Sequence, residues 1–123
     1  MIDIANETKP FNINTAGLGI FTGDYPVLFI PLVKTDKLIT MHKKVWELFK
    51  SVGDGRSNYY HPGSWVPHIS LAHTDLNKEN IGNVMKYLTF ENFNWEITVD
   101  NIAFIYKPTD SIGRLKYNFK FNK

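Results

Sequence analysis

One buried strand constrains the fold of this chain more than any other stretch of its sequence. Residues Val27–Val33 form an unbroken apolar run, which is typical of a strand covered on both of its faces. Pro31 cannot donate a ladder hydrogen bond, so it predicts an edge position or a bulge at that point. With 123 residues, of which 43% are hydrophobic and 15% aromatic, we expect a single domain over residues 1–123 with one substantial core.

Two stretches have the period of an amphipathic helix. In residues 38–52 apolar side chains recur at steps of three and four, and Thr35 or Asp36 can cap the start of this helix. A second helix begins at Asn77 and carries its apolar stripe over residues 81–88. We expect these two to be the main helices of the domain.

Three further segments alternate polar and apolar residues, as strands do. These segments are residues 11–21, 95–106 and 115–121. The middle segment changes phase at Asp100-Asn101, which predicts a bulge or a tight turn. The first ten residues are mostly polar and predict a loosely held lead-in. Strands in runs, with helices on one side, predict an α+β fold built from antiparallel sheets.

Composition and charge exclude several classes of protein. The net charge of +2 and the pI near 8.8 permit an anionic partner, but they fall short of the clustered positive charge of a dedicated nucleic-acid binder. The absence of cysteine excludes disulfides, thiolate nucleophiles and zinc-cysteine sites. The first residues lack the pattern of a signal peptide, and no run of about 18 apolar residues occurs. We therefore expect a cytoplasmic protein that does not enter a membrane.

The chemistry of the chain concentrates in Trp65–Thr74, a short strand with a proline before it. In this strand His68 and Ser70 alternate with Ile69 and Leu71. Successive strand residues point to opposite faces, so the imidazole and the hydroxyl share one face. An imidazole exchanges a proton near neutral pH, and a hydroxyl donates a hydrogen bond to a nonbridging phosphate oxygen. The pair predicts a phosphate-handling site.

The segment Pro67–Ala72 resembles the His-x-Ser/Thr signature of the 2H phosphoesterase superfamily, which includes the 2′-5′ RNA ligase-like proteins and the cyclic nucleotide phosphodiesterases. The order of strands, helices and loops is similar over roughly residues 11 to 121. The resemblance implies a two-lobed fold in which two such motifs face each other across a groove. One histidine is then the general base and the other the general acid, each Ser or Thr holds the phosphate, and no metal is required.

For this chain the resemblance implies a catalytic role for His68 and a phosphate-binding role for Ser70. The substrates would be RNA ends or small nucleotides with a 2′,3′-cyclic or 2′-5′ phosphodiester, and we expect no cofactor. Tyr60 and Tyr106 are candidates for stacking on a base, and His61 could reach the substrate from the same aromatic loop as Tyr60. An ordinary surface connection is the alternative interpretation of that loop.

The sequence departs from the family pattern because it contains one His-x-Ser/Thr rather than two. The histidines are His42, His61, His68 and His73, and Ser or Thr follows two places later only at His68. His42 lies at the edge of a helical stripe, which favours a structural role. His73 points away from the face of His68 in a regular strand, and no metal-ligand spacing joins these histidines.

The chain thus looks like a 2H protein that lacks its first motif, with an incomplete two-lobed fold. It would be a fragment of a longer two-motif enzyme, or a naturally shortened member reduced to an inactive RNA- or nucleotide-binding remnant. Alternatively, two copies pair in a homodimer and rebuild the groove. The sequence leaves these explanations open.

Overall fold

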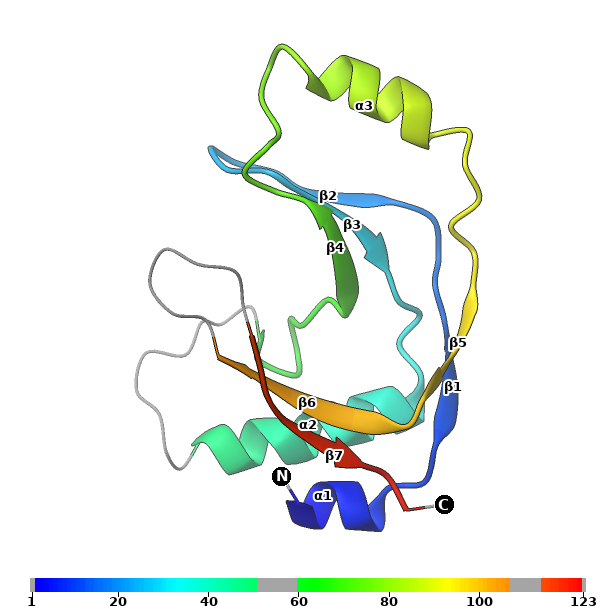
Figure 1. The fold of residues 1–123 in the computed structure, drawn as a ribbon, viewed down its shortest axis with the longest axis vertical. Coiled ribbons are helices and arrows are strands. Elements are labelled where there is room, and N and C mark those ends of the chain that lie inside the picture. Colours follow the sequence, from blue (N-terminus) through cyan, green and yellow to red (C-terminus); the bar gives the residue numbers. More distant parts are fainter. Residues whose placement is uncertain (1, 51–59, 107–113, 123) are drawn as a thin grey trace. The chain divides into compact units, whose positions relative to one another are not determined.

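The computed structural model describes residues 2–50, 60–106 and 114–122, and it confirms an α+β fold with antiparallel sheets (Figure 1). Its elements are α1 (Ile2–Glu7), β1 (Phe11–Asn14), β2 (Gly19–Phe21), β3 (Val27–Pro31), α2 (Asp36–Lys50), β4 (His68–Ala72), α3 (Ile81–Leu88), β5 (Glu96–Val99), β6 (Asn101–Tyr106) and β7 (Arg114–Lys120). In this described part, β1 pairs with β5, β2–β3–β4 form a second sheet, and β6 pairs with β7. No helix within it is long and apolar enough to cross a membrane.

The chain divides into two compact units. The first comprises residues 1–12, 35–64 and 98–123, and the second comprises residues 13–34 and 65–97. The first therefore holds α1, α2 and the β6–β7 pair, whereas the second holds the β2–β3–β4 sheet and α3. Each unit gathers segments that are far apart in the sequence.

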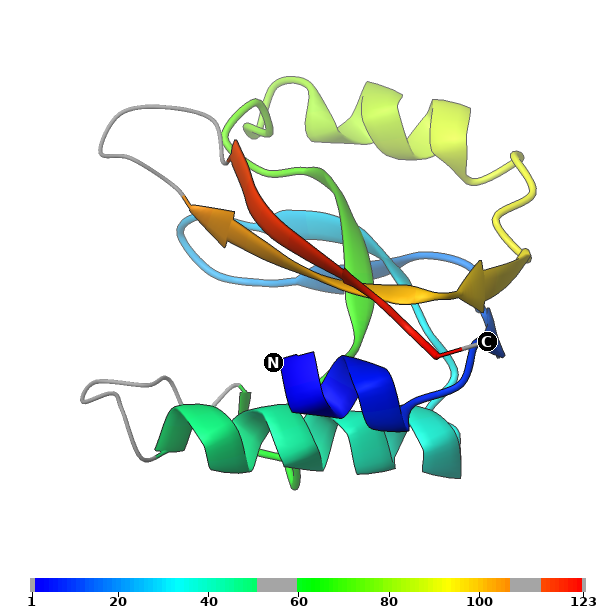
Figure 2. The same ribbon diagram turned by 60° about the horizontal axis from the view of Figure 1, so that its bottom comes forward.

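In the first unit, the prediction of a loosely held lead-in was wrong. Residues Ile2–Glu7 form α1, which packs against both α2 and β7 (Figure 2). The reason is burial, because Ile4 and Ala5 are only 8% and 1% exposed. The backbone N–H of Asn122 also donates hydrogen bonds to the carbonyl oxygens of Ala5 and Thr8. Two buried side chains and residue Asn122 thus hold a segment of which only half the residues are apolar.

The other predicted elements of this unit are largely confirmed. The Oγ1 atom of Thr35 accepts a hydrogen bond from the N–H of Leu38 at 3.3 Å, which caps α2 as expected. The last two residues of the predicted 38–52 helix lie outside the described residues. The phase change at Asp100-Asn101 is neither the predicted bulge nor a tight turn, because β5 ends at Val99, β6 begins at Asn101 and the two strands belong to different sheets.

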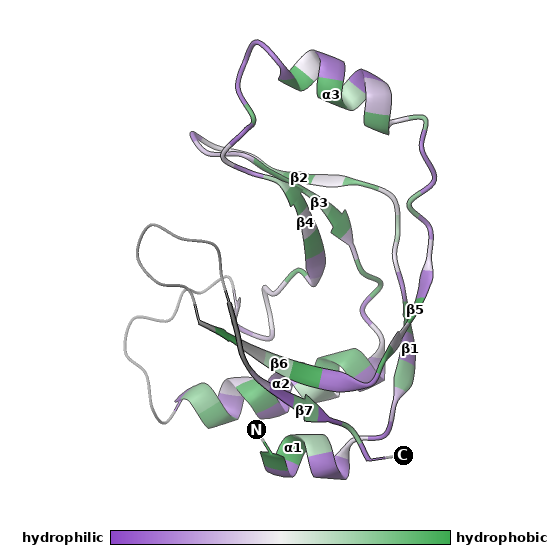
Figure 3. Cartoon of the chain, in the orientation of Figure 1, coloured by the Kyte–Doolittle hydropathy of each residue, from purple (hydrophilic) through white to green (hydrophobic). Residues whose placement is uncertain are grey.

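The second unit is built around β3, the central strand of its sheet. Leu28 and Ile30 are fully buried and Phe29 is 6% exposed, which confirms a strand covered on both faces. Figure 3 shows that β3 is largely hydrophobic. The prediction for Pro31 was wrong, because this residue ends a central strand rather than marking an edge or a bulge. Pairing continues past this residue, because its carbonyl oxygen accepts the N–H of Ala16 at 2.9 Å and Leu32 bridges to Thr15.

The predicted strand over residues 11–21 is two strands that belong to different sheets. Gly17, with a φ of 73°, lies between them in a conformation that few other residues adopt. Thr15 is 5% exposed, and its Oγ1 donates to the carbonyl oxygen of Phe93 at 2.5 Å and accepts the N–H of Trp95 at 2.6 Å. This buried hydroxyl joins the first segment of the second unit, residues 13–34, to the last residues of its second segment.

The second predicted helix begins at Ile81, with Asn80 as its N-cap residue, rather than at Asn77, because residues 78–80 form a turn before it. The Oδ1 of Asn77 accepts the N–H of Asn80 at 2.8 Å, and the Oδ1 of Asn80 accepts the N–H of Asn77 at 2.9 Å. The N–H of Ile81 then donates to the carbonyl of Asn77 at 3.1 Å, and regular helix continues to Leu88. Two side chains thereby satisfy backbone donors at the helix start.

Candidate functional site

Strand β4 places His68 and Ser70 on one face of the second unit's sheet. His68 pairs with Pro31 and Ser70 pairs with Phe29 on the neighbouring strand β3. Residues two apart in a strand point to the same side, so the imidazole and the hydroxyl are neighbours on that face. His68 is half-buried and Ser70 is exposed. The face therefore offers a supported ring beside an accessible hydroxyl.

A bulge interrupts β4 directly after this pair. Leu28 pairs with Ala72 while the next residue of β3, Phe29, pairs with Ser70, so Leu71 is the extra residue of β4. Leu71 is 41% exposed, and the strand ends one residue later. Bulges bend a strand and re-aim its side chains, and they are frequent beside functional sites. This bulge sets the limit of the regular ladder at Ser70.

The ring of His68 is anchored by a backbone carbonyl. Its Nδ1 lies 2.6 Å from the carbonyl oxygen of Val66. A carbonyl oxygen only accepts hydrogen bonds, so Nδ1 carries the hydrogen and the Nε2 of a neutral ring holds a lone pair. Val66 precedes Pro67, which restricts its backbone to extended conformations, and the N–H of Leu32 donates to the carbonyl oxygen of Pro67 at 3.0 Å. The anchor is thus a rigid piece of backbone.

Two phenylalanine rings support the other side of the imidazole. The His68 ring centroid lies 4.9 Å from that of Phe21, with the planes at 88°, and 5.3 Å from that of Phe29, with the planes at 60°. The two phenylalanine rings are themselves stacked, with centroids 4.1 Å apart. Edge-to-face contacts of this kind favour one ring orientation. Sequence reasoning did not assign Phe21 or Phe29 to the site, although both lie in apolar strand segments.

The other candidates for substrate contact belong to the first unit. Tyr60 is 56% exposed, and its carbonyl oxygen lies 2.7 Å from the Nε2 of His42, which gives His42 a structural partner. His61 packs its ring against Trp46 with centroids 5.5 Å apart, and its Nδ1 accepts the N–H of Gly63 at 3.0 Å. The contacts of Tyr60 with His42 and of His61 with Trp46 hold this segment onto α2.

The last two candidates, Tyr106 and His73, lie at the ends of strands. Tyr106 is the last residue of β6, in the first unit, and its backbone pairs with Arg114 of β7. His73 is exposed in the bend that follows β4. The bulge at Leu71 reverses the alternation, so a prolonged β4 would carry His73 on the face of His68, but the strand ends before it. The structure thus brings His68 and Ser70 together and assigns Tyr60, His61 and Tyr106 to the other unit.

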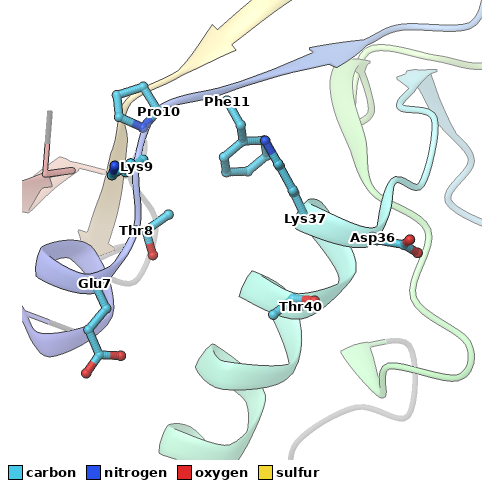
Figure 4. A pocket seen from close by; sticks show the side chains of 8 residues that line it. All are labelled: Glu7, Thr8, Lys9, Pro10, Phe11, Asp36, Lys37 and Thr40. Atoms are coloured by element: carbon cyan, nitrogen blue, oxygen red, sulfur yellow. The ribbon is translucent and has the colours of Figure 1, made fainter.

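A shallow hollow of about 410 Å³ lies within the first unit, between the end of α1 and the first turns of α2 (Figure 4). Its lining residues are Glu7, Thr8, Lys9, Pro10, Phe11, Asp36, Lys37 and Thr40. The lining holds two acidic and two basic side chains and no histidine, so it offers no excess of positive charge to an anion. Among the described residues, no group of three or more His, Asp or Glu side chains could share a metal ion.

A family model matches most of the chain. The family model of the 2′-5′ RNA ligase superfamily matches residues 3–110, which include parts of both units and all of β4. No curated protein matches the chain.

Proposed function

The chain belongs to the 2′-5′ RNA ligase superfamily, which is the 2H phosphoesterase superfamily, and from this premise we propose that it hydrolyses phosphodiesters by histidine acid/base catalysis. The substrates would be 2′,3′-cyclic or 2′-5′ phosphodiesters of RNA ends or small nucleotides. His68 exchanges a proton with the reacting oxygen, and Ser70 donates a hydrogen bond to a nonbridging phosphate oxygen. Tyr60 and Tyr106 are candidates for base stacking, and His61 for a further substrate contact.

The observation that carries this proposal is the hydrogen bond between His68 Nδ1 and the carbonyl oxygen of Val66, at 2.6 Å. It leaves Nε2 as the proton-accepting atom of the neutral ring, on the face that Ser70 shares. A general base needs its proton-accepting nitrogen in a fixed position, and this hydrogen bond supplies one. The exposed hydroxyl of Ser70 supplies the donor that a phosphate oxygen requires.

Hydrolysis of a 2′,3′-cyclic phosphodiester defines the two proton transfers. The oxygen of a water molecule forms a bond to phosphorus, while the bond from phosphorus to one sugar oxygen breaks. A base takes the proton of the attacking water, and an acid gives a proton to the departing sugar oxygen. His68 performs one of these transfers, so a complete cycle requires a second proton carrier.

The direct test compares His68→Ala and Ser70→Ala with the unchanged protein on a 2′,3′-cyclic nucleotide and a 2′-5′-linked dinucleotide. We expect His68→Ala to lose about 10²- to 10⁴-fold in kcat, with a melting temperature that is nearly unchanged. Thr74→Ala is the matched hydroxyl control, because Thr74 is exposed in the turn after β4. A large loss of stability in His68→Ala, with no turnover in the unchanged protein, would favour a structural histidine.

The same assay locates the second proton carrier. His61→Ala and His73→Ala are measured over a range of pH, and the variant that loses one limb of the pH–rate profile identifies the second group. If both variants retain the complete profile, a His68 from a second copy of the chain is the next candidate. Specific activity that falls on dilution, together with a monomer–dimer equilibrium in sedimentation, would support such a homodimer.

An inactive binding module is the second candidate function. The observation that favours it is the single His-x-Ser/Thr of the sequence, which supplies one of the two histidines that the family reaction uses. Titration calorimetry with a 2′,3′-cyclic nucleotide separates the candidates, because the binding module forms a complex and shows no turnover at any pH. Turnover that depends on His68 would exclude it.

A further inference from the structure

The face that carries His68 contains a glycine whose missing side chain makes room for a ring. Gly19 of β2 pairs with Phe29 of β3. A Cβ atom at Gly19 would lie 2.4 Å from Cζ and 2.5 Å from Cε2 of Phe29, which is far inside any real carbon–carbon contact. The ring of Phe29 therefore lies directly over the backbone of Gly19. A strand glycine often marks such a close approach.

This placement decides on which side of β3 the Phe29 ring lies. Phe29 has Gly19 opposite it on β2 and Ser70 opposite it on β4. Because the ring occupies the space over Gly19, Ser70 remains exposed. The ring also stacks on that of Phe21, with centroids 4.1 Å apart, and both phenylalanine rings make edge-to-face contacts with the His68 imidazole.

We propose that Gly19 is a positioning residue for His68, acting through Phe29. Its bare backbone lets Phe29 lie across β2, and Phe29 and Phe21 then hold the imidazole in the orientation that keeps Nδ1 on the Val66 carbonyl. The catalytic consequence rests on the proposed function of His68, whereas the effect on its ring does not. The hydrogen bond to Val66 and the contacts with the two phenylalanine rings together define one tautomer of His68 and one direction for its Nε2.

The physical reason is that the Phe29 ring has no free alternative position. Phe29 is 6% exposed, with Phe21 stacked on it, so its ring cannot turn outward without leaving the packed cluster. The φ of Gly19 lies outside the left-handed region, so alanine fits its backbone, and the three atoms nearest to the added Cβ all belong to the ring of Phe29. An alanine there pushes the ring from its place beneath His68 or towards Ser70.

The test uses the full chain and reads the imidazole directly. Long-range ¹H–¹⁵N correlation spectra of His68 report which ring nitrogen carries the hydrogen, and turnover of a 2′,3′-cyclic nucleotide reports kcat and KM. The variants are Gly19→Ala, Phe29→Leu and the double variant. Gly82→Ala is the matched control, since nothing lies within 4 Å of a Cβ placed at Gly82 in α3.

We expect the unchanged protein and Gly82→Ala to show one neutral tautomer, with hydrogen on Nδ1. In Gly19→Ala the two tautomers should mix, and kcat should fall by up to about 10²-fold with little change in KM, as expected when a reacting group is misplaced by about 1 Å. In the Phe29→Leu background the added alanine should have no further effect on the tautomer, because the ring that it strikes is gone.

Two results would overturn the proposal. The first is a Gly19→Ala protein with a lower melting temperature but an unchanged His68 tautomer, which would make the glycine merely structural. The second is an equal effect of the alanine with and without the Phe29 ring. If Gly19→Ala does not fold, Phe21→Leu removes one supporting ring and must also mix the tautomers. If the unchanged protein shows no turnover, the proposed function fails while the tautomer measurements still decide this inference.

Discussion

The replacement of Thr15 by valine tests how much the buried Thr15 hydroxyl stabilises the second unit, in which it joins residues 13–34 to residues 93–95. Valine has nearly the shape of threonine but no hydroxyl, so it removes the acceptor for the N–H of Trp95, at 2.6 Å, and the donor to the carbonyl of Phe93, at 2.5 Å. Thr15 is 5% exposed, so water does not readily replace the hydroxyl. A partly buried donor left without its partner costs about 1–3 kcal/mol.

For a domain of this size, each 1 kcal/mol lowers the melting temperature by about 4 °C. We therefore expect Thr15→Val to melt about 4–12 °C below the unchanged protein, measured by circular dichroism. Thr15→Ser is the matched control, because it keeps the hydroxyl and loses one methyl group, at a cost of about 0.8 kcal/mol. Hydrogen exchange adds a local measurement, since the amide of Trp95 should lose its protection only in Thr15→Val.

The reasoning is refuted if Thr15→Val is as stable as Thr15→Ser. It is also refuted if the Trp95 amide exchanges at the same rate in both variants. Either result would mean that the buried hydroxyl contributes nothing beyond its volume, and that backbone pairing alone closes the second unit.

Two further predictions concern the first unit. His42→Ala removes the hydrogen bond to the carbonyl of Tyr60, and urea unfolding should show a loss of about 0.5–1.5 kcal/mol; an unchanged midpoint would contradict the structural role. The side-chain N–H of Asn101, at 2.7 Å, and then the charge of Lys120, at 3.6 Å, hold the pKa of the Asp100 carboxyl below its usual value. Because the pKa is lower in the folded state, the ionised carboxylate stabilises the protein above about pH 4, and this stabilisation is lost as the pH falls through the folded pKa. Asp100→Asn should therefore lose less stability between pH 6 and pH 2 than the unchanged protein does. Equal losses in the two proteins would contradict this.

Local patterns predicted the elements whose causes are local. The stripe from Leu38 onward and the hydroxyl of Thr35 are neighbours in sequence, so α2 and its cap followed from periodicity alone. The unbroken run at Val27–Val33 similarly predicted a strand buried on both faces. The alternation of His68 and Ser70 with apolar neighbours placed both on one face, because the period of a strand is a property of the backbone.

The errors arose where distant residues decide the structure. Helix α1 exists because Ile4 and Ala5 are buried and because Asn122 hydrogen-bonds to it from the other end of the chain, and no local pattern reports this. Pro31 was expected at an edge or a bulge, yet it is the last residue of a central strand, since the order of β2, β3 and β4 depends on segments far apart in the chain.

The sequence by itself determined the family, the motif of His68 and Ser70, and the composition of the strands that surround it. Only the tertiary structure decided what supports the imidazole. The carbonyl of Val66 fixes its tautomer, and the space over Gly19 admits the ring of Phe29 from another strand. The physical reason is that a strand's period specifies which face a side chain takes, whereas its neighbours across the sheet depend on strand order and register, which are set by the packing of segments far apart in the chain.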